Sequence, residues 1–210
     1  MAVDNFYFFL AIVPAIVLHE VSHGYVAYLC GDPTAKENHR LTLNPIRHVD
    51  LFGTILLPAL LLFSGFPAIG YAKPVPVNIS RLRKPRSQAL YVALAGPATN
   101  IVLVALSYAV FKGVVHLGDS RPVVVVLYAC YYFGVANILL AAFNLLPIPP
   151  LDGSAVIERF VPQRHLPAYY HFRARALPVL MVLIILNAVV FHVGTNALTS
   201  LENWWINLLN

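Results

Sequence analysis

Charged residues are scarce in this chain, and their scarcity excludes an ordinary soluble domain. Asp, Glu, Lys and Arg make up 11% of the 210 residues and hydrophobic residues 59%, and the mean hydropathy is +0.72. Soluble domains carry about 25% charged residues. The composition therefore predicts an integral membrane protein that lies in a lipid bilayer. The apolar runs are too long and too numerous for one cleaved signal, so we expect the N-terminal segment to be retained.

Cysteine is also rare. Cys30 and Cys130 lack the Cys-x-x-Cys spacing of a structural zinc or redox site, and we expect them to be buried free thiols. The formal net charge of +5 does not predict nucleic-acid binding, because the basic residues fall in short connections beside apolar segments, as membrane topology requires. No internal repeat, low-complexity segment, PDZ-like or CBS-like appendage is visible, so residues 1–210 are expected to form a single domain.

Hydropathy predicts an all-α polytopic membrane protein. Four segments have spanning length: about 6–30, 88–111, 122–146 and 177–195. A shorter apolar run, Leu51 to about Phe66, is flanked on both sides by basic residues, and the positive-inside rule places both flanks in the cytoplasm. We therefore expect this run to re-enter the membrane or to form a short broken helix rather than to span, with prolines and glycines as the breaks.

The same rule sets the orientation. No Lys or Arg precedes the first span, so the N-terminus is predicted to lie outside and the first span to end in the cytoplasm. The third span then brings Asn144–Gly153 to that side, and the fourth returns outward, leaving Trp204 and Trp205 as interfacial anchors. The predicted location is a cell membrane, with the chemistry toward the cytoplasmic side.

The first span contains His19-Glu20-Val21-Ser22-His23, the His-Glu-x-x-His pattern of zinc proteases. Residues four apart on an α-helix share a face, so both imidazoles can reach one metal ion. Glu20 is turned about a quarter turn from His19 and suits a general base acting on a metal-bound water. Ionisable side chains inside a membrane are costly unless paired or metal-bound, which favours a metal site over histidines that merely hydrogen-bond neighbouring helices.

A catalytic zinc ion takes three protein ligands and one water, so a further ligand is needed. The metzincin extension is excluded, because Val26 and Leu29 occupy its glycine and histidine positions. Glu37 lies in a polar loop and fits poorly. Asp152 fits better, because it follows the third span on the histidine side, where prolines unwind the backbone and Gly153 allows a tight turn. We expect one zinc ion per chain, although residue types alone do not separate zinc from cobalt or iron.

Two motifs lie on separate apolar segments: His19-Glu20-x-x-His23 and Asn144-x-x-Pro147-x-x-x-x-Asp152-Gly153. In this order the pair resembles the site-2 protease family of intramembrane zinc metalloproteases. Further likeness lies in Leu41–Pro45, Gly70–Asn78 and Gly96–Asn100, so it touches most of the chain. Leu41–Pro45 and Gly70–Asn78 resemble the compact bacterial branch of the family, which lacks PDZ and CBS domains and leaves open how substrates are selected.

The resemblance implies a zinc metalloendopeptidase that cleaves peptide bonds within or near the transmembrane segments of other proteins. It implies His19, His23 and Asp152 as the zinc ligands and Glu20 as the base. It also implies that Asn144 holds the substrate or stabilises the oxyanion. A transmembrane protein substrate in a bacterial cell membrane is the implied partner, and the consequence would be regulated intramembrane proteolysis.

Weaker features keep more than one interpretation. The extended pattern of Lys73–Asn78 predicts either a small β-hairpin whose edge clamps substrate by β-addition or an ordinary proline-rich loop. Gly96 and Pro97 indicate close helix packing and a kink more readily than catalysis. Asn100, if it points inward, is expected to hydrogen-bond substrate or the backbone of the third span beside the metal site. His48, alone in a loop, is left outside the metal set.

Two other functions stay open at this point. A metal-binding membrane transporter also uses intramembrane histidines and carboxylates, but it predicts further polar residues along spans whose outer halves are largely apolar. A catalytically inactive relative acting as a membrane adaptor is the other, and the presence of His19, Glu20, His23 and Asp152 together argues against it. The substrate, the cleavage site and the oligomeric state are left open by the sequence.

Overall fold

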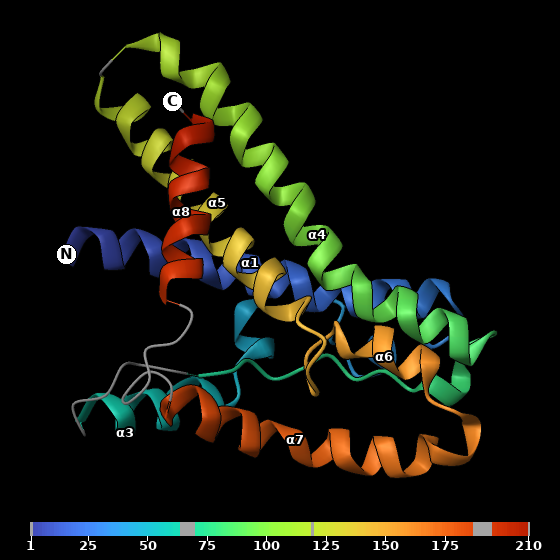
Figure 1. Cartoon of the computed structure of the whole chain (residues 1–210). Coiled ribbons are helices and arrows are strands. Elements are labelled where there is room, and N and C mark those ends of the chain that lie inside the picture. Colours follow the sequence, from blue (N-terminus) through green and yellow to red (C-terminus); the bar gives the residue numbers. More distant parts are fainter. Residues whose placement is uncertain (1, 64–69, 119, 187–194, 210) are drawn as a thin grey trace.

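The computed structural model describes residues 2–63, 70–118, 120–186 and 195–209, which are helical apart from their connections (Figure 1). The longer helices are α1 (Ala2–Leu29), α4 (Pro85–Val114), α5 (Arg121–Asn144), α7 (Leu166–Leu186) and α8 (Thr195–Leu209). The short ones are α2 (Thr34–Glu37), η1 (Pro45–His48), η2 (Leu51–Leu56), α3 (Leu57–Phe63), η3 (Ile79–Arg81), η4 (Val115–Leu117), α6 (Ser154–Phe160) and η5 (Gln163–His165). The all-α prediction is confirmed.

No β-strand occurs in the described part of the chain. The small β-hairpin considered for Lys73–Asn78 is therefore not formed, and this segment is an extended connector between α3 and η3. Its composition explains the difference. Pro74 and Pro76 carry no N–H, so they cannot donate to a strand ladder.

Four helical segments are long and apolar enough to cross a membrane, as predicted: Phe6–Leu29, Pro85–Leu117, Arg121–Asn144 and Gln163–Leu186. The chain is thus a multi-pass membrane protein. The last segment begins earlier than the predicted span, which covered 177–195. By the positive-inside rule the charge of Arg173 favours a cytoplasmic loop, but Arg173 lies inside α7 and pairs with Glu158 of α6, Nη1 to Oε2 3.0 Å. Residues 187–194 of the predicted span lie outside the described residues.

The short apolar run Leu51–Phe63 is helical, with a wide turn in η2 that continues into α3. At about 1.5 Å per residue it measures roughly 20 Å, against about 30 Å for the hydrocarbon core of a bilayer. The described helix is therefore too short for a straight crossing. The remainder of the predicted segment, 64–66, lies outside the described residues.

Helices α1, α4 and α5 pack against one another and form the centre of the molecule (Figure 1). Small residues make the α1–α5 contact: Ala11, Ala15 and Ala136 are buried together. Small side chains at its centre let the helix backbones approach closely, and Phe8, Ile12 and Leu140 pack against them. The three helices thereby form a tight frame for the ends of α1 and α5.

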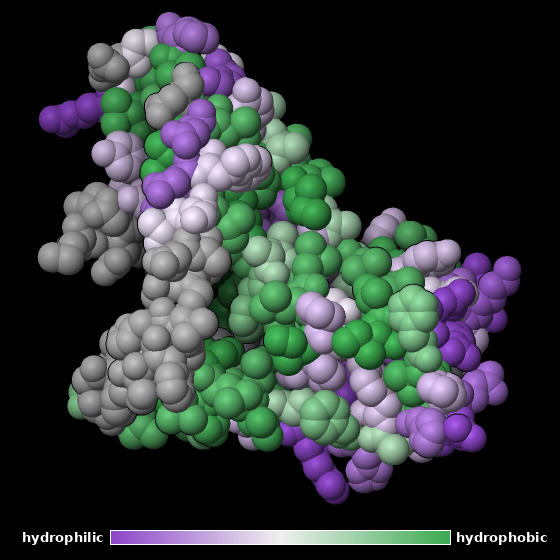
Figure 2. Space-filling view, viewed as in Figure 1, coloured by the Kyte–Doolittle hydropathy of each residue, from purple (hydrophilic) through white to green (hydrophobic). Residues whose placement is uncertain are grey.

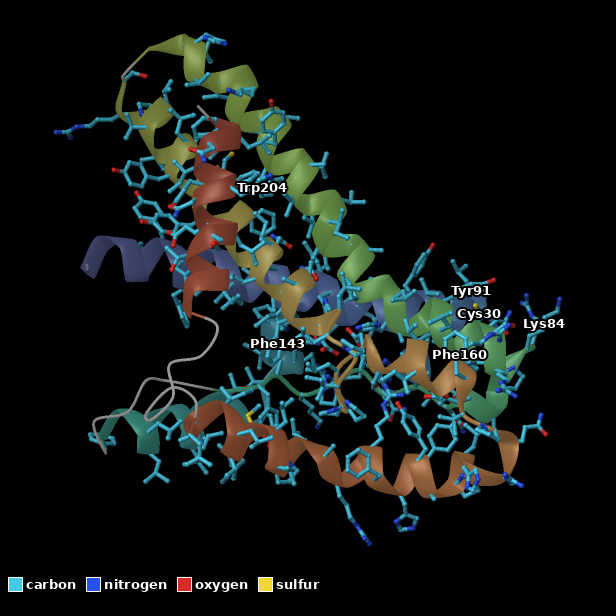
Figure 3. All side chains as sticks on the ribbon, viewed as in Figure 1. Cys30, Lys84, Tyr91, Phe143, Phe160 and Trp204 are labelled. Atoms are coloured by element: carbon cyan, nitrogen blue, oxygen red, sulfur yellow. The ribbon has the colours of Figure 1, made fainter. Side chains whose placement is uncertain are left out.

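Helix α8 packs on α5 through Trp205, which is fully buried. Its Nε1 donates to the carbonyl of Tyr131 at 3.1 Å. A Cβ on Gly134 would lie 2.1 Å from Cζ2 of this ring, so glycine is what lets the indole sit against the helix. The prediction of an interfacial anchor is wrong for Trp205, whereas the neighbouring Trp204 is 52% exposed (Figure 3).

Hydrophobic residues cover much of the surface over the long helices, and hydrophilic residues gather at the end of the molecule where α4 begins (Figure 2). Lys84, labelled in Figure 3, marks that end. Leu106 and Val110 of α4 and Val179 and Val182 of α7 are examples of large apolar side chains that stay exposed. In a multi-pass protein such side chains face lipid.

Candidate metal centre

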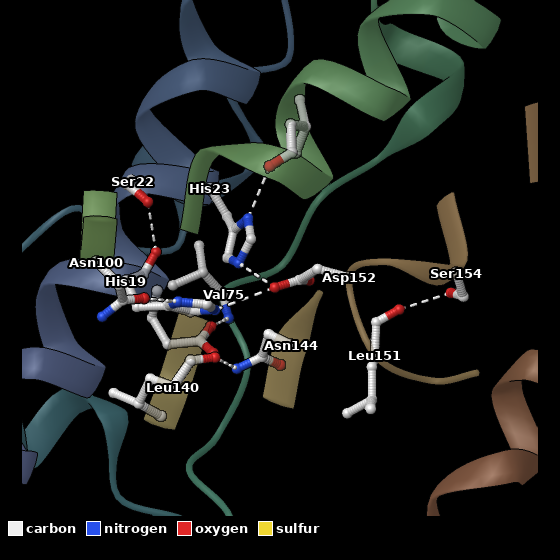
Figure 4. A network of polar contacts seen from close by, with 12 residues as sticks. His19, Ser22, His23, Val75, Asn100, Leu140, Asn144, Leu151, Asp152 and Ser154 are labelled. Carbon is white, nitrogen blue, oxygen red and sulfur yellow. Dashed lines mark hydrogen bonds and ion pairs between the residues drawn. The ribbon is translucent and has the colours of Figure 1, made fainter. Parts of the chain in front are cut away.

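Three side chains from distant parts of the chain converge at the crossing of α1 and α4 (Figure 4). His19 and His23 lie one turn apart on α1, and Asp152 lies in the loop after α5. Oδ2 of Asp152 is 3.1 Å from Nε2 of His19 and 3.3 Å from Nε2 of His23. One ligand atom from each residue lies within 4.8 Å of the other two, which is a geometry that could hold a metal ion.

The loop after α5 folds back on the end of that helix, and this fold aims Asp152 inward. The N–H of Gly153 donates to the carbonyl of Asn144 at 2.7 Å, and Ser154 Oγ donates to the carbonyl of Leu151 at 2.6 Å. A Cβ on Gly153 would lie 2.2 Å from the carbonyl oxygen of Leu145. A glycine is thus required at position 153, because the backbone of Leu145 lies too close to leave space for a Cβ.

Both imidazoles are oriented by acceptors on their far nitrogens. Nδ1 of His23 lies 2.7 Å from the carbonyl oxygen of Val92, and Nδ1 of His19 lies 2.5 Å from Oδ1 of Asn100. A carbonyl oxygen accepts only, so each Nδ1 carries a proton, and Nε2 is the nitrogen that each ring turns toward the cluster. This is the arrangement that metal-ligating histidines adopt.

Two of the three distances within the cluster suit zinc, and the three ligand atoms lie within 4.8 Å of one another. Two ligand atoms at about 2.0–2.1 Å from a tetrahedral zinc ion lie about 3.3 Å apart, close to the 3.1 and 3.3 Å found here. Gly96 of α4 provides the space for this cluster. A Cβ at position 96 would lie 2.4 Å from Nε2 of His23 and 2.5 Å from Nε2 of His19. Any side chain there would fill the space beside both nitrogens.

Burial and charge act in opposite directions on Asp152. Burial raises the pKa of its carboxyl, but hydrogen bonds and charge interactions with His19 and His23 outweigh this and lower the pKa to about 2. The carboxyl group is therefore ionised at neutral pH. With zinc in place of the protons that these hydrogen bonds require, an anionic oxygen and two neutral imidazoles form a donor set that zinc accepts.

Glu20 lies beside the cluster and is not part of it. Its Oε2 accepts a hydrogen bond from the backbone N–H of Val75 at 2.9 Å. The side chain of Asn144 lies near the cluster in Figure 4, and its Nδ2 donates to the carbonyl of Leu140 at 3.0 Å. The free, half-buried thiols of Cys30 and Cys130 belong to other parts of the molecule.

Asn100 is fully buried and links α1 to α5. Its Oδ1 accepts a hydrogen bond from Nδ1 of His19, and its Nδ2 donates to Oδ1 of Asn137 at 2.7 Å. Asn137 in turn donates to the carbonyl of Phe133 at 2.7 Å. Asn100 therefore does hydrogen-bond the third span, as expected. Its partner there is the side chain of Asn137 and not the backbone.

Sequence reasoning missed Asn137, the carbonyl of Val92, the closeness of Gly96 to the imidazoles, and the amide of Val75. An asparagine inside an apolar helix is a usable signal, since a buried amide in a membrane needs a partner, and Asn137 had it. The backbone groups carry no signal in the sequence, because every residue except proline has the same N–H and C=O.

The profile of peptidase family M50 matches residues 7–125 and 112–187 of the chain. The chain belongs to peptidase family M50. This is the site-2 protease family that the two motifs resemble, and membership makes the chain a zinc metalloprotease with protein substrates.

Relatives within the M50 family support this membership. YwhC of Bacillus subtilis is 40% identical over 159 residues, covering 74% of this chain and 69% of YwhC. Rip2 of Mycolicibacterium smegmatis is 30% identical over 149 residues, covering 69% of this chain and 53% of Rip2. Both carry the name "putative zinc metalloprotease". The chain thus spans about half of Rip2, and no solved structure matches it.

Proposed function

We propose that this M50 peptidase is an intramembrane endopeptidase that hydrolyses peptide bonds within or beside the transmembrane segments of other membrane proteins. One zinc ion per chain is bound by His19, His23 and Asp152. Glu20 is the general base, and Asn144 binds the substrate at the scissile bond. Residues 1–210 act as a single domain.

The observation that carries the proposal is the meeting of three ligand-type side chains where membrane-spanning helices end. Phe6–Leu29 holds both histidines, and Arg121–Asn144 leads into the loop of Asp152. Ionisable groups at such a depth are costly unless they bind a metal or each other. Membership of a zinc protease family, together with ligands carried on or beside candidate membrane spans, favours substrates that are themselves in the membrane.

The chain's own groups divide the chemistry. Bound zinc would polarise the scissile carbonyl and lower the pKa of a water molecule. Glu20 accepts the proton of the attacking water and returns it to the leaving amine. The amide of Asn144 has two hydrogens, and its bond to Leu140 leaves one N–H for the carbonyl oxygen on which negative charge develops. Asn100 holds His19 in the ligating tautomer.

Basic residues near the cluster support a site at the cytoplasmic side. Arg40 Nη2 donates to the carbonyl of Lys73, two residues before Val75, which contacts Glu20. Lys73 thus belongs to the connection that contacts the proposed base, and Arg40 is hydrogen-bonded to that connection. The positive-inside rule assigns connections with basic residues to the cytoplasm.

Cleavage and metal content, measured on the same samples, test the proposal. A panel of labelled single-span membrane proteins is incubated in detergent with purified wild type, Glu20→Gln and Asp152→Ala. We expect cleavage by wild type alone, about one zinc per chain in wild type and Glu20→Gln, and loss of zinc in Asp152→Ala. Full zinc affinity in Asp152→Ala would contradict its role as a ligand.

The same experiment separates the alternatives. Zinc without cleavage by wild type on every substrate would favour an adaptor, and well-folded protein that binds no stoichiometric metal would refute the protease proposal. Cleavage by Glu20→Gln at the wild-type rate would exclude Glu20 as the base.

A further inference from the structure

A backbone amide reaches the proposed general base. The N–H of Val75 donates to Oε2 of Glu20 at 2.9 Å. Pro74 and Pro76, on either side, carry no N–H. Val75 therefore holds the single amide hydrogen of residues 74–76, and that hydrogen is directed at Glu20.

The extended segment Lys73–Asn78 is fixed at both ends, so this amide is held in place. Lys73 donates its N–H to the carbonyl of His48 at 2.9 Å, and its own carbonyl accepts from Arg40 Nη2 at 2.8 Å. At the other end, the N–H of Asn78 donates to Oδ2 of the fully buried Asp32 at 2.6 Å. The segment is tied to the connection that follows α1.

The side chain of Val75 seats the segment on the face of α1 that carries Glu20. It is 7% exposed. A Cβ on Gly24 would lie 2.7 Å from its Cγ1, so the absence of a side chain on Gly24 provides the space. Glu20 and Gly24 are one helical turn apart and share a face.

The contact with this segment explains why the Arg40 side chain is buried. Its side chain is buried, and no carboxylate among the described residues lies within ion-pair distance of it. A buried charge without a counter-charge is costly. The charge-assisted hydrogen bond to the carbonyl of Lys73 is the contact that Arg40 makes, and it stiffens the segment two residues from the Val75 amide.

We infer, building on the proposed function, that the backbone amide of Val75 positions the Glu20 carboxylate for catalysis. Glutamate is among the side chains with the most rotamer freedom, and one fixed oxygen removes much of it. A carboxylate has about four acceptor sites, so this bond leaves the other oxygen free for the attacking water.

The arrangement also bears on substrate binding by this segment. Alternate residues of an extended chain present their backbone groups to one edge, and on that edge Lys73 and Val75 already donate within the protein. The opposite edge at Pro74 and Pro76 has no donors. The segment is thus better suited to support the base than to add a substrate strand.

Amide hydrogen exchange tests the contact without using activity. Because Pro74 and Pro76 have no amide hydrogen, exchange within residues 74–76 reports Val75 alone. We expect slow exchange in the zinc-loaded wild type, exchange about tenfold or more faster in Glu20→Ala, and an intermediate rate in Glu20→Gln, whose side-chain oxygen still accepts. Equal exchange in wild type and Glu20→Ala would overturn the inference.

A backbone ester tests the consequence for catalysis. Replacing Val75 with α-hydroxyvaline removes the N–H and keeps the side chain, and the same replacement at Val77 is the matched control, because the amide of Val77 makes no hydrogen bond to the described residues. We expect kcat to fall about tenfold to a hundredfold at position 75, with KM and zinc content unchanged, and no change at position 77.

Each outcome points to one conclusion. A position-75 ester that cleaves at the wild-type rate, or faster, would overturn the positioning role while Glu20→Gln stays inactive. A wild-type protein that cleaves no substrate would refute the proposed function instead, and the exchange result would still decide whether the Val75 amide and the Glu20 carboxylate are joined.

Discussion

Replacing Gly96 with alanine tests how closely α4 approaches the candidate metal centre. The new Cβ would lie 2.4 Å from Nε2 of His23 and 2.5 Å from Nε2 of His19. Non-bonded heavy atoms settle at about 3.5–4.0 Å. The imidazoles or the backbone of α4 must therefore move by roughly 1 Å to admit one methyl group.

Neither imidazole can move without a loss, because Nδ1 of each is held by Asn100 or by the carbonyl of Val92. Overpacking of this kind destabilises proteins by about 1–3 kcal/mol, and disturbed hydrogen bonds behind metal ligands lower metal affinity about 10–100-fold. We expect Gly96→Ala to show both effects. Proteolysis should fall further than zinc affinity, since a misplacement of about 1 Å can reduce a catalysed rate a hundredfold.

Competition with a zinc chelator measures the affinity, and thermal unfolding in detergent measures the stability. Gly113→Ala on the same helix is the control, because nothing packs within 4 Å of the position its Cβ would take. It should leave zinc affinity unchanged and should not lower stability, since alanine is the better helix former. Gly96→Ala protein that binds zinc as tightly as wild type would refute the close approach of α4.

Three further substitutions test other contacts. Gly134→Ala should lower the free energy of unfolding by about 1–3 kcal/mol in thermal unfolding, because its Cβ would lie 2.1 Å from the ring of Trp205. Glu158→Gln should lower it by about 1–3 kcal/mol, because it removes the charge that faces Arg173 at 3.0 Å from a buried position. Asn100→Leu should lower zinc affinity about 10–100-fold in chelator competition, because it removes the acceptor that orients a proposed ligand.

Controls for these substitutions are available in the chain. Glu37→Gln, in an exposed pair with Arg81, should leave thermal unfolding unchanged, since such pairs are screened by solvent. If Glu158→Gln proved as harmless as Glu37→Gln, the burial of its pair would carry no energetic weight. Unchanged unfolding of Gly134→Ala would mean that α8 does not pack on α5 as described, and unchanged zinc affinity of Asn100→Leu would show that its bond does not orient the ligand.

The parts of the site that follow from helix periodicity were predictable. His19 and His23 had to share a face of one helix, and Asp152 had to lie at the end of the third span on the same side. Asn100 was also predictable as an inward residue, because an amide in a membrane needs a partner. Each of these inferences depends on local geometry or on the sign of a charge, which the sequence carries directly.

Other features depend on how the helices are rotated and crossed, which hydropathy does not encode. The contact of Gly96 with the imidazoles exists because α4 crosses α1 at that residue. Arg173 lies within α7, where it finds an acidic partner on a different helix. The burial of Trp205 depends equally on a glycine seventy residues earlier in the chain.

The order of residues in the cluster also has a consequence for biosynthesis. His19 and His23 enter the membrane with the first span, but Asp152 leaves the ribosome only after the second and third spans have been made. During most of translation the chain therefore carries two histidines without their acidic partner. The nascent chain therefore cannot assemble the complete donor set until its second and third spans have been synthesised.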